Sequence, residues 1–167
     1  MRSFGQAKMI APKYLTDSLT PWYGAWTLSA GGSLSISYAS LPPQSDILAK
    51  LVCDTPGGGY GSIQFLFNAP QNIGGTVLEF WHRCALNPTL NKYYYIQTPD
   101  SASYYKTFGA AVGNWLLFQI PMPDPTSLVS TGISKSRIAC RMNKLVFDYG
   151  VAGAWTFEIA GLTFRRL

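Results

Sequence analysis

The sequence predicts an all-β protein: an antiparallel β-sandwich of the jelly-roll type with an extended N-terminal arm. Three observations carry this prediction. Eight or more short apolar or alternating segments follow one another at a spacing of roughly 8 to 12 residues. Glycine and proline, with 16 and 11 copies, separate these segments and favour turns. No long segment shows the apolar period of an amphipathic helix.

The composition fits one ordinary domain with a largely neutral surface. A chain of 167 residues can bury a two-layer core without disulfide or metal staples. Charged residues make up only 13% of the chain, well under the usual quarter. Such a surface suits contact with neutral partners or with copies of the chain itself. We expect residues 21–167 to form the domain and residues 1–20 to form the arm.

The arm has few apolar anchors and neither helical nor strand periodicity. Its main apolar residues are Phe4, Ile10, Tyr14 and Leu15. Such a segment buries too little on its own to offset its ordering entropy. It is therefore ordered only if another part of the structure holds it. Either its own domain or a neighbouring subunit does so, and in the second case these four residues form an assembly arm.

Three segments of the first half predict strands. Residues 34–38 alternate apolar side chains with serine, as a half-buried strand does. Residues 46–53 are a mostly apolar run of strand length, and residues 63–67 alternate until Pro70 ends the strand. Between the last two lies a glycine-rich turn that lets Tyr60 project from its tip.

The middle of the chain predicts a buried strand and a hairpin. Residues 76–84 are largely apolar at both parities, which indicates a central strand covered on both faces. Residues 92–96 and 104–108 have the spacing of an antiparallel hairpin with a medium loop. Residues 127–141 fit either one helical turn or a short edge strand.

The last third predicts strands at residues 114–122, 144–149 and 155–164, with Trp115 and Trp155 in the core. In the final strand the apolar residues keep one parity up to Ile159 and the other parity from Leu162 onward. Because side chains alternate with a period of two, the apolar face survives only if residues 160–161 insert a bulge.

The stretch from Asn114 to Phe164 resembles the C-terminal half of galactose-binding-like jelly rolls, the sandwich of many carbohydrate-binding modules. The resemblance lies in the Trp-containing strand 114–121, an apolar strand ending at Phe147, and a last strand of the type aromatic-x-aromatic-acid-Ile at 155–159. Those modules often carry an aspartate in the last strand, near a structural calcium site. Only Glu158 offers a carboxylate here, so the resemblance leaves a calcium site near it open.

A second, looser likeness is to β-sandwich proteins with extended arms that decorate tailed bacteriophages or form part of their tails. It rests on the arm, the low charge and the N-terminus, which has no apolar segment typical of a secretory signal. This likeness implies synthesis in a host cytoplasm and a final location in the virion.

The titratable residues do not assemble into a recognisable catalytic motif. His82 is the single histidine and lies inside a strand, where a packed or surface role is more common than catalysis. Glu79 and Glu158 are the best candidates for a glycosidase pair, but each fits equally a strand residue that pairs with an arginine or lies on an outer face. We therefore predict no catalytic, cofactor-binding or metal-binding residue. Three cysteines, at positions 53, 84 and 140, fit small buried hydrophobes.

Charge and hydropathy argue against two partner classes. The net charge of +5 is scattered, whereas a nucleic-acid site requires a basic stripe. No apolar run approaches the ~20 residues that span a bilayer. We therefore expect neither nucleic acid nor a membrane as partner.

The tyrosines remain as the candidate binding surface. Aromatic rings stack on the C–H faces of sugars and also dominate protein interfaces. The first hypothesis is a non-catalytic virion protein whose arm and tyrosines bind other protein subunits, as in a homo-oligomer such as a trimer. The alternative is a carbohydrate-binding module or lectin that binds a cell-surface glycan on the same tyrosines. The residues concerned are Tyr60, Tyr93, Tyr94, Tyr95, Tyr104 and Tyr105.

Overall fold

The fold was obtained as a computed structural model. It describes residues 12–20, 23–28, 31–56, 61–84, 92–97, 103–108, 113–122, 128–129, 141–149 and 154–167. In the strands at 92–97 and 103–108 the description is of the backbone. Within the described residues no helix is long and apolar enough to cross a membrane.

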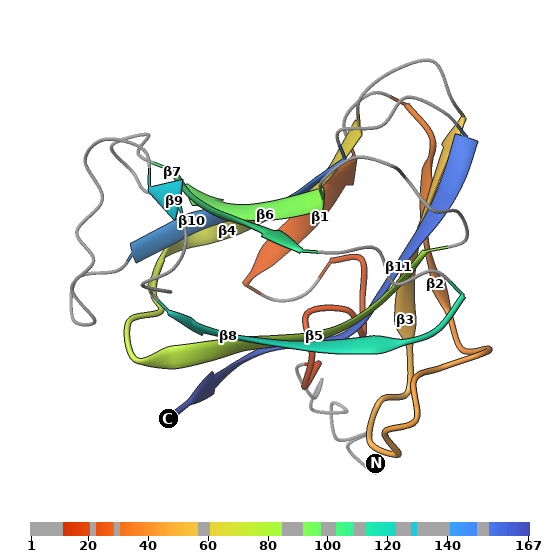
Figure 1. Cartoon of the computed structure of the whole chain (residues 1–167), viewed down its shortest axis with the longest axis horizontal. Helices are drawn as coiled ribbons and strands as arrows, with labels where there is room; N and C mark the ends of the chain where they lie inside the picture. The colour runs from red at the N-terminus through yellow and green to blue at the C-terminus, as the bar shows by residue number, and fades with distance from the viewer. Residues whose placement is uncertain are drawn as a thin grey trace, which may run out of the picture.

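The described strands form two antiparallel sheets packed face to face, as Figure 1 shows. Sheet A has the order β1-β4-β10-β6-β7-β9, and sheet B has the order β2-β3-β11-β5-β8. This confirms the predicted antiparallel β-sandwich of jelly-roll type. In chain order the strands are β1 Gly24–Leu28, β2 Ser33–Ser37, β3 Lys50–Pro56, β4 Gly61–Asn72, β5 Thr76–Cys84, β6 Lys92–Gln97, β7 Ser103–Phe108, β8 Leu116–Met122, β9 Leu128–Val129, β10 Arg141–Tyr149 and β11 Ala154–Arg166.

The core lies between the sheets and is built from alternate residues of each strand. Phe147 of sheet A packs edge-on against Phe80 of sheet B, with ring centroids 5.3 Å apart. Phe65, Phe80, Phe147 and Phe157 have no exposed surface. Burying a large aromatic side chain stabilises a domain by roughly 1.5–3 kcal/mol, so these four rings contribute strongly to holding the two sheets together.

The predicted bulge in the last strand is present. The pairing of β11 with β5 shifts between Ala160 and Thr163, and Gly161 has a φ of 61°. Ile159 before the shift and Leu162 after it are both fully buried. The extra residue therefore keeps both halves of the strand facing the core, as the change of parity requires.

The strands differ from the predictions in several places, of which three have a local explanation. β3 begins at Lys50 rather than at residue 46, because residues 46–49 form a loop that buries Ile47 and Ala49. β4 continues through Pro70, which is tolerated because the pairing with β10 is irregular at that point. β1 was not predicted as a strand, since its five residues include one glycine and too few alternating positions for a period to emerge.

Part of the predicted arm packs within the domain. Tyr14 and Leu15 are 4% and 2% exposed. The backbone N–H of Leu15 donates to the carbonyl of Leu162, at 2.9 Å, and the indole of Trp26 donates to the carbonyl of Leu15, at 2.9 Å. The domain's own core therefore holds Tyr14 and Leu15. Phe4 and Ile10 lie outside the described residues.

Candidate functional site

The outer face of sheet A is defined by the strand register. Val146 of β10 is paired with Gln64 of β4 on one side and with Tyr95 of β6 on the other, and Tyr95 is paired with Tyr105 of β7. Directly paired residues share a face. This row lies on the outer face, because its neighbours Leu145 and Phe147 belong to the core.

Tyr93 lies two residues from Tyr95 and is therefore on the same outer face. It is paired with Asp148, which is itself paired with Ser62. We call the outer face of sheet A at Tyr93, Tyr95 and Tyr105 the tyrosine face.

The register assigns the other two tyrosines of the hairpin to the opposite face. Tyr94 is paired with Phe147, and Tyr104 is paired with Ile96, whose other partner is Leu145. Both positions therefore belong to the side of sheet A that faces the core. The hairpin tyrosines thus divide into three on the outer face and two on the inner face, and Tyr60 lies outside the described residues.

On β4, beside the tyrosine face, the described outward-facing side chains change from polar to apolar along the strand. The amide of Gln64 donates to the hydroxyl of Ser62 at 2.9 Å. Leu66, two residues along β4, is 42% exposed. Val146 has no exposed surface, so neighbouring groups cover it on this face.

The outer face of sheet B carries a buried ion cluster instead. Glu158 of β11 accepts hydrogen bonds from Lys50 of β3 and from Arg83 of β5. The Arg83 guanidinium also lies over the ring of Trp115, 4.7 Å from its centroid, in a cation–π contact. Burial acts to raise the pKa of Glu158, but the hydrogen bonds from Arg83 and Lys50 outweigh it and hold the pKa below its usual range.

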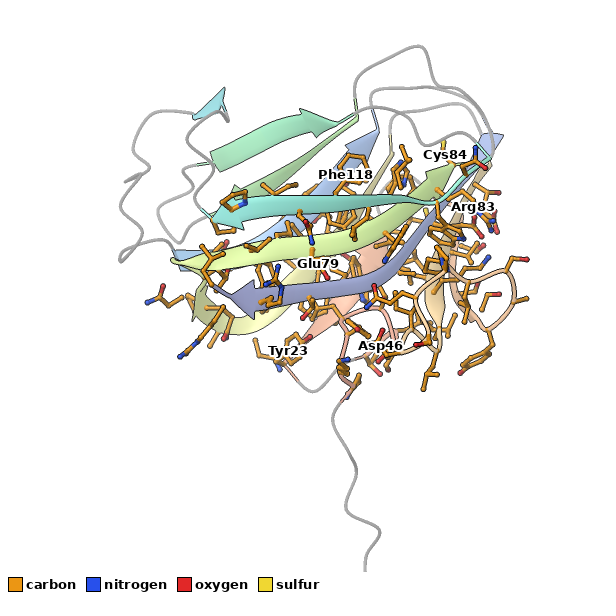
Figure 2. All side chains as sticks on the ribbon, turned by 60° about the horizontal axis from the view of Figure 1, so that its bottom comes forward. Tyr23, Asp46, Glu79, Arg83, Cys84 and Phe118 are labelled. Atoms are coloured by element: carbon orange, nitrogen blue, oxygen red, sulfur yellow. The ribbon has the colours of Figure 1, made fainter. Side chains whose placement is uncertain are left out.

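Glu79 has its own polar partners, further along β5 in Figure 2. It accepts a hydrogen bond from the amide of Gln119 at 2.7 Å and lies 3.7 Å from the Arg165 guanidinium. Glu79 and Glu158 therefore match the alternative in which each is a strand residue paired with an arginine. For Glu158, whose pKa is held below its usual range, this is the opposite of the raised pKa of a general acid.

A loop at residues 38–48 covers another part of the outer face of sheet B. The indole of Trp81 donates to the side chain of Gln44 at 3.0 Å, and the indole of Trp115 donates to the carbonyl of Ser40 at 3.1 Å. Trp115 was predicted to lie in the core, but it is only half-buried beside β8. It packs against a small second cluster of buried residues that includes Tyr14 and Ile47, and on Arg83. The side chain of Trp155 lies outside the described ones.

The histidine and the described cysteines are core residues. His82 has no exposed surface, and its ring centroid lies 4.2 Å from that of Phe157. Cys53 and Cys84 are buried thiols outside any disulfide, and burial, aided by the charge of Asp54, raises the pKa of Cys53 to about 12. A buried thiol of this kind is unreactive. Cys140 lies outside the described residues.

The sequence alone matches no protein-family model and no curated protein, whereas the fold matches solved structures. The family 11 carbohydrate-binding module of a cellulosomal cellulase from Clostridium thermocellum superposes with a TM-score of 0.60, at 10% identity, over 93% of this chain and 94% of that one. The fold is a jelly roll of the carbohydrate-binding-module type. This confirms the resemblance inferred from residues 114–164.

Two further structures bear out this jelly roll. A family 30 carbohydrate-binding module superposes with a TM-score of 0.58, at 11% identity, over 80% of this chain and 73% of that one. An exo-β-agarase superposes with a TM-score of 0.63, at 9% identity, over 85% of this chain but only 23% of its own. Identities this low establish the fold alone. Nothing in these likenesses supports a virion role, and assembly with other subunits stays a prediction.

Proposed function

We propose that this chain is a non-catalytic carbohydrate-binding domain that holds a neutral polysaccharide on the tyrosine face. The observation that carries the proposal is the register that puts Tyr93, Tyr95 and Tyr105 on one outer face of a carbohydrate-binding-module-type sandwich. Tyrosine rings offer a flat apolar surface to the C–H face of a sugar and a hydroxyl for hydrogen bonding.

The spacing of the three tyrosines suits a chain rather than a single sugar. Tyr95 and Tyr105 are directly opposed across two strands, a separation of roughly 5 Å. Tyr93 lies two residues along the same strand, roughly 7 Å away. The platform therefore extends along the strand as well as across it, and the amide of Gln64 and the partners of Tyr93 provide polar groups at its side.

The neighbours of this fold suggest which polysaccharides to test first. One family 11 module was solved in complex with a β-1,3-1,4-mixed-linked tetrasaccharide and superposes with a TM-score of 0.56 at 9% identity. The neighbours also include agarases. Because this chain has few charges, mixed-linkage β-glucan, cellulose and agarose are suitable neutral probes.

Replacing Tyr95 or Tyr105 by alanine is expected to weaken polysaccharide binding by about tenfold each, the loss of one stacking contact of ~1.4 kcal/mol. Affinity electrophoresis in gels containing each polysaccharide measures this loss. Tyr38→Ala is the matched control, because Tyr38 is 75% exposed and lies just beyond β2 in the other sheet. The proposal is refuted if none of the polysaccharides retards the wild-type chain, or if Tyr38→Ala weakens binding as much as Tyr95→Ala.

A further inference from the structure

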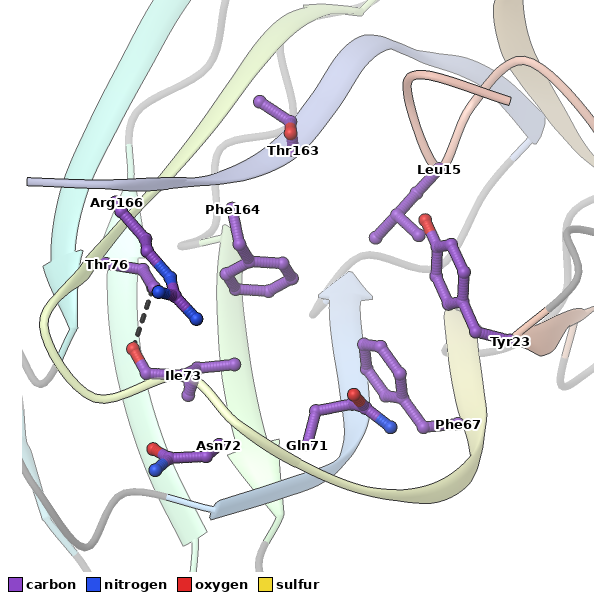
Figure 3. Close-up of a pocket in the computed structure, with 10 residues that line it drawn as sticks. All are labelled: Leu15, Tyr23, Phe67, Gln71, Asn72, Ile73, Thr76, Thr163, Phe164 and Arg166. Atoms are coloured by element: carbon purple, nitrogen blue, oxygen red, sulfur yellow. Dashed lines mark hydrogen bonds between the residues drawn. The ribbon is translucent and has the colours of Figure 1, made fainter. Parts of the chain in front are cut away.

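A pocket of about 330 Å³ opens between the two sheets, at the end where β11 finishes (Figure 3). Phe164 of β11 forms one wall, and Tyr23 and Phe67 form the opposite wall. The rings of Tyr23 and Phe67 are stacked, with centroids 6.0 Å apart and planes 17° from parallel. Gln71 and Arg166 also line the pocket.

The bulge of β11 explains why a cation lies in this pocket. After the bulge, Leu162 and Phe164 have the parity that faces the core, and Arg166 has the same parity two residues later. The core-facing side of the strand therefore ends in a guanidinium. Arg165 has the other parity and lies 3.7 Å from Glu79 on the outer face of sheet B.

Arg166 is the source of charge in this pocket. Among the described residues, those that line the pocket include no carboxylate, and no ion pair of Arg166 is found. Burial, together with the charge of Asp17, raises the pKa of Tyr23 far above its usual value, so that the phenol stays neutral. Among the described residues that line it, the pocket thus combines aromatic walls with one positive charge.

The dimensions fit one sugar ring. Ligand sites range over roughly 300–1,000 Å³, so a pocket of about 330 Å³ admits one saturated six-membered ring but no chain. The aromatic walls suit the C–H faces of such a ring. The guanidinium suits a carboxylate, which it binds through two parallel hydrogen bonds.

We propose that this pocket is a second binding site, specific for an acidic monosaccharide unit, a hexuronate whose carboxylate pairs with Arg166 and whose ring packs between Phe164 and Tyr23. The site is separate from the tyrosine face and does not depend on the function proposed for it. It gives the domain a way to distinguish acidic from neutral saccharides.

The test is a titration of the full chain, labelled with ¹⁵N, with glucuronate, galacturonate and glucose. Either uronate is expected to shift the backbone amide signals of residues 71–76 and 163–167, whereas glucose shifts neither set at the same concentration. Arg166→Gln is expected to weaken uronate binding about tenfold or more, because a charge-assisted bidentate pair is lost. Arg165→Gln, the matched neighbour, is expected to leave uronate binding unchanged.

The proposal is overturned if the wild-type chain does not respond to either uronate, if glucose binds equally well, or if the two arginine variants lose the same amount. Arg166 is exposed, so Arg166→Gln should fold. Gln71→Ala, at another wall of the pocket, provides a second test of uronate binding. A galacturonate trimer distinguishes two sources of the ligand: tighter binding than the monomer indicates a chain end, and equal binding indicates a free sugar. Tyr95→Ala should change none of these results, so the two sites can fail separately.

Discussion

Replacing Glu158 by glutamine is expected to lower the free energy of unfolding by about 3 kcal/mol. The side chain of Glu158 is 12% exposed, and it neutralises Lys50, whose side chain is 6% exposed. It also binds Arg83 through both of its oxygens. Glutamine keeps the shape but removes the negative charge, which leaves two cations close together in a poorly solvated position. Chemical denaturation followed by tryptophan fluorescence measures the change.

Glu79→Gln is the matched control for this prediction. Glu79 lies on the same face of sheet B and its side chain is 17% exposed, but its partner Arg165 is 56% exposed and 3.7 Å away. Such a half-exposed, widely spaced pair contributes less than about 1 kcal/mol. A triple variant with Lys50→Met, Arg83→Met and Glu158→Leu should recover most of the lost stability, because it removes the unpaired charges altogether. Equal losses in the two glutamine variants would contradict the buried-cluster interpretation.

The contribution of Glu158 should also depend on pH. Its pKa is held below the usual 4.5 in the folded chain, so the unfolded chain binds the proton more readily. The stabilisation is therefore complete above about pH 4.5 and decreases as the pH falls through the folded pKa. Asp46, whose pKa is lowered by hydrogen bonds from Lys13, Tyr14 and Gln44, titrates in the same direction. The useful measurement is thus the stability difference between the wild type and Glu158→Gln, which should shrink at low pH.

Local sequence patterns were sufficient for much of the fold. The change of parity in the last strand predicted the bulge at residues 160–161, because only an inserted residue can keep both halves of that strand on the core. The spacing of residues 92–96 and 104–108 predicted their antiparallel pairing. What the patterns could not provide was the order of strands in each sheet, because it depends on contacts between segments distant in the sequence. The cluster of Lys50, Arg83 and Glu158 arises from that order alone.

The tyrosine face was likewise predictable only in part from local sequence patterns. Alternation in the sequence already separates Tyr94 from its two neighbours. Alternation cannot decide whether Tyr104 or Tyr105 shares the face of Tyr95, because that choice depends on the hairpin register. The structure pairs Tyr95 with Tyr105, which makes a specific pair to substitute. The pocket beside Phe164 was not predicted, since its walls come from both sheets.

Replacing Gly161 by alanine is expected to lower the free energy of unfolding by about 3 kcal/mol, from two sources. Gly161 has a φ of 61°, a conformation that costs a residue with a side chain roughly 1–2 kcal/mol. A Cβ atom at this position would also lie 2.6 Å from Cδ1 of Ile47, a buried side chain that is 3% exposed. Overpacking of this kind costs typically 1–3 kcal/mol. Thermal and chemical unfolding measure the total.

Gly75→Ala separates the two sources. Gly75 has a similar φ of 74°, but nothing lies within 4 Å of an added Cβ. This variant should therefore lose only the part of the unfolding free energy that comes from the positive φ. Ile47→Val removes the Cδ1 atom that would clash, so it should recover part of the loss in the Gly161→Ala background although it costs stability alone. If Gly161→Ala costs no more than Gly75→Ala, or if Ile47→Val adds its full cost in both backgrounds, Ile47 does not pack against the bulge. Partial recovery would instead show that the side chain of Ile47 lies against the bulge of β11. The bulge then both keeps the core continuous and contacts the loop at 46–49 on the outer face of sheet B.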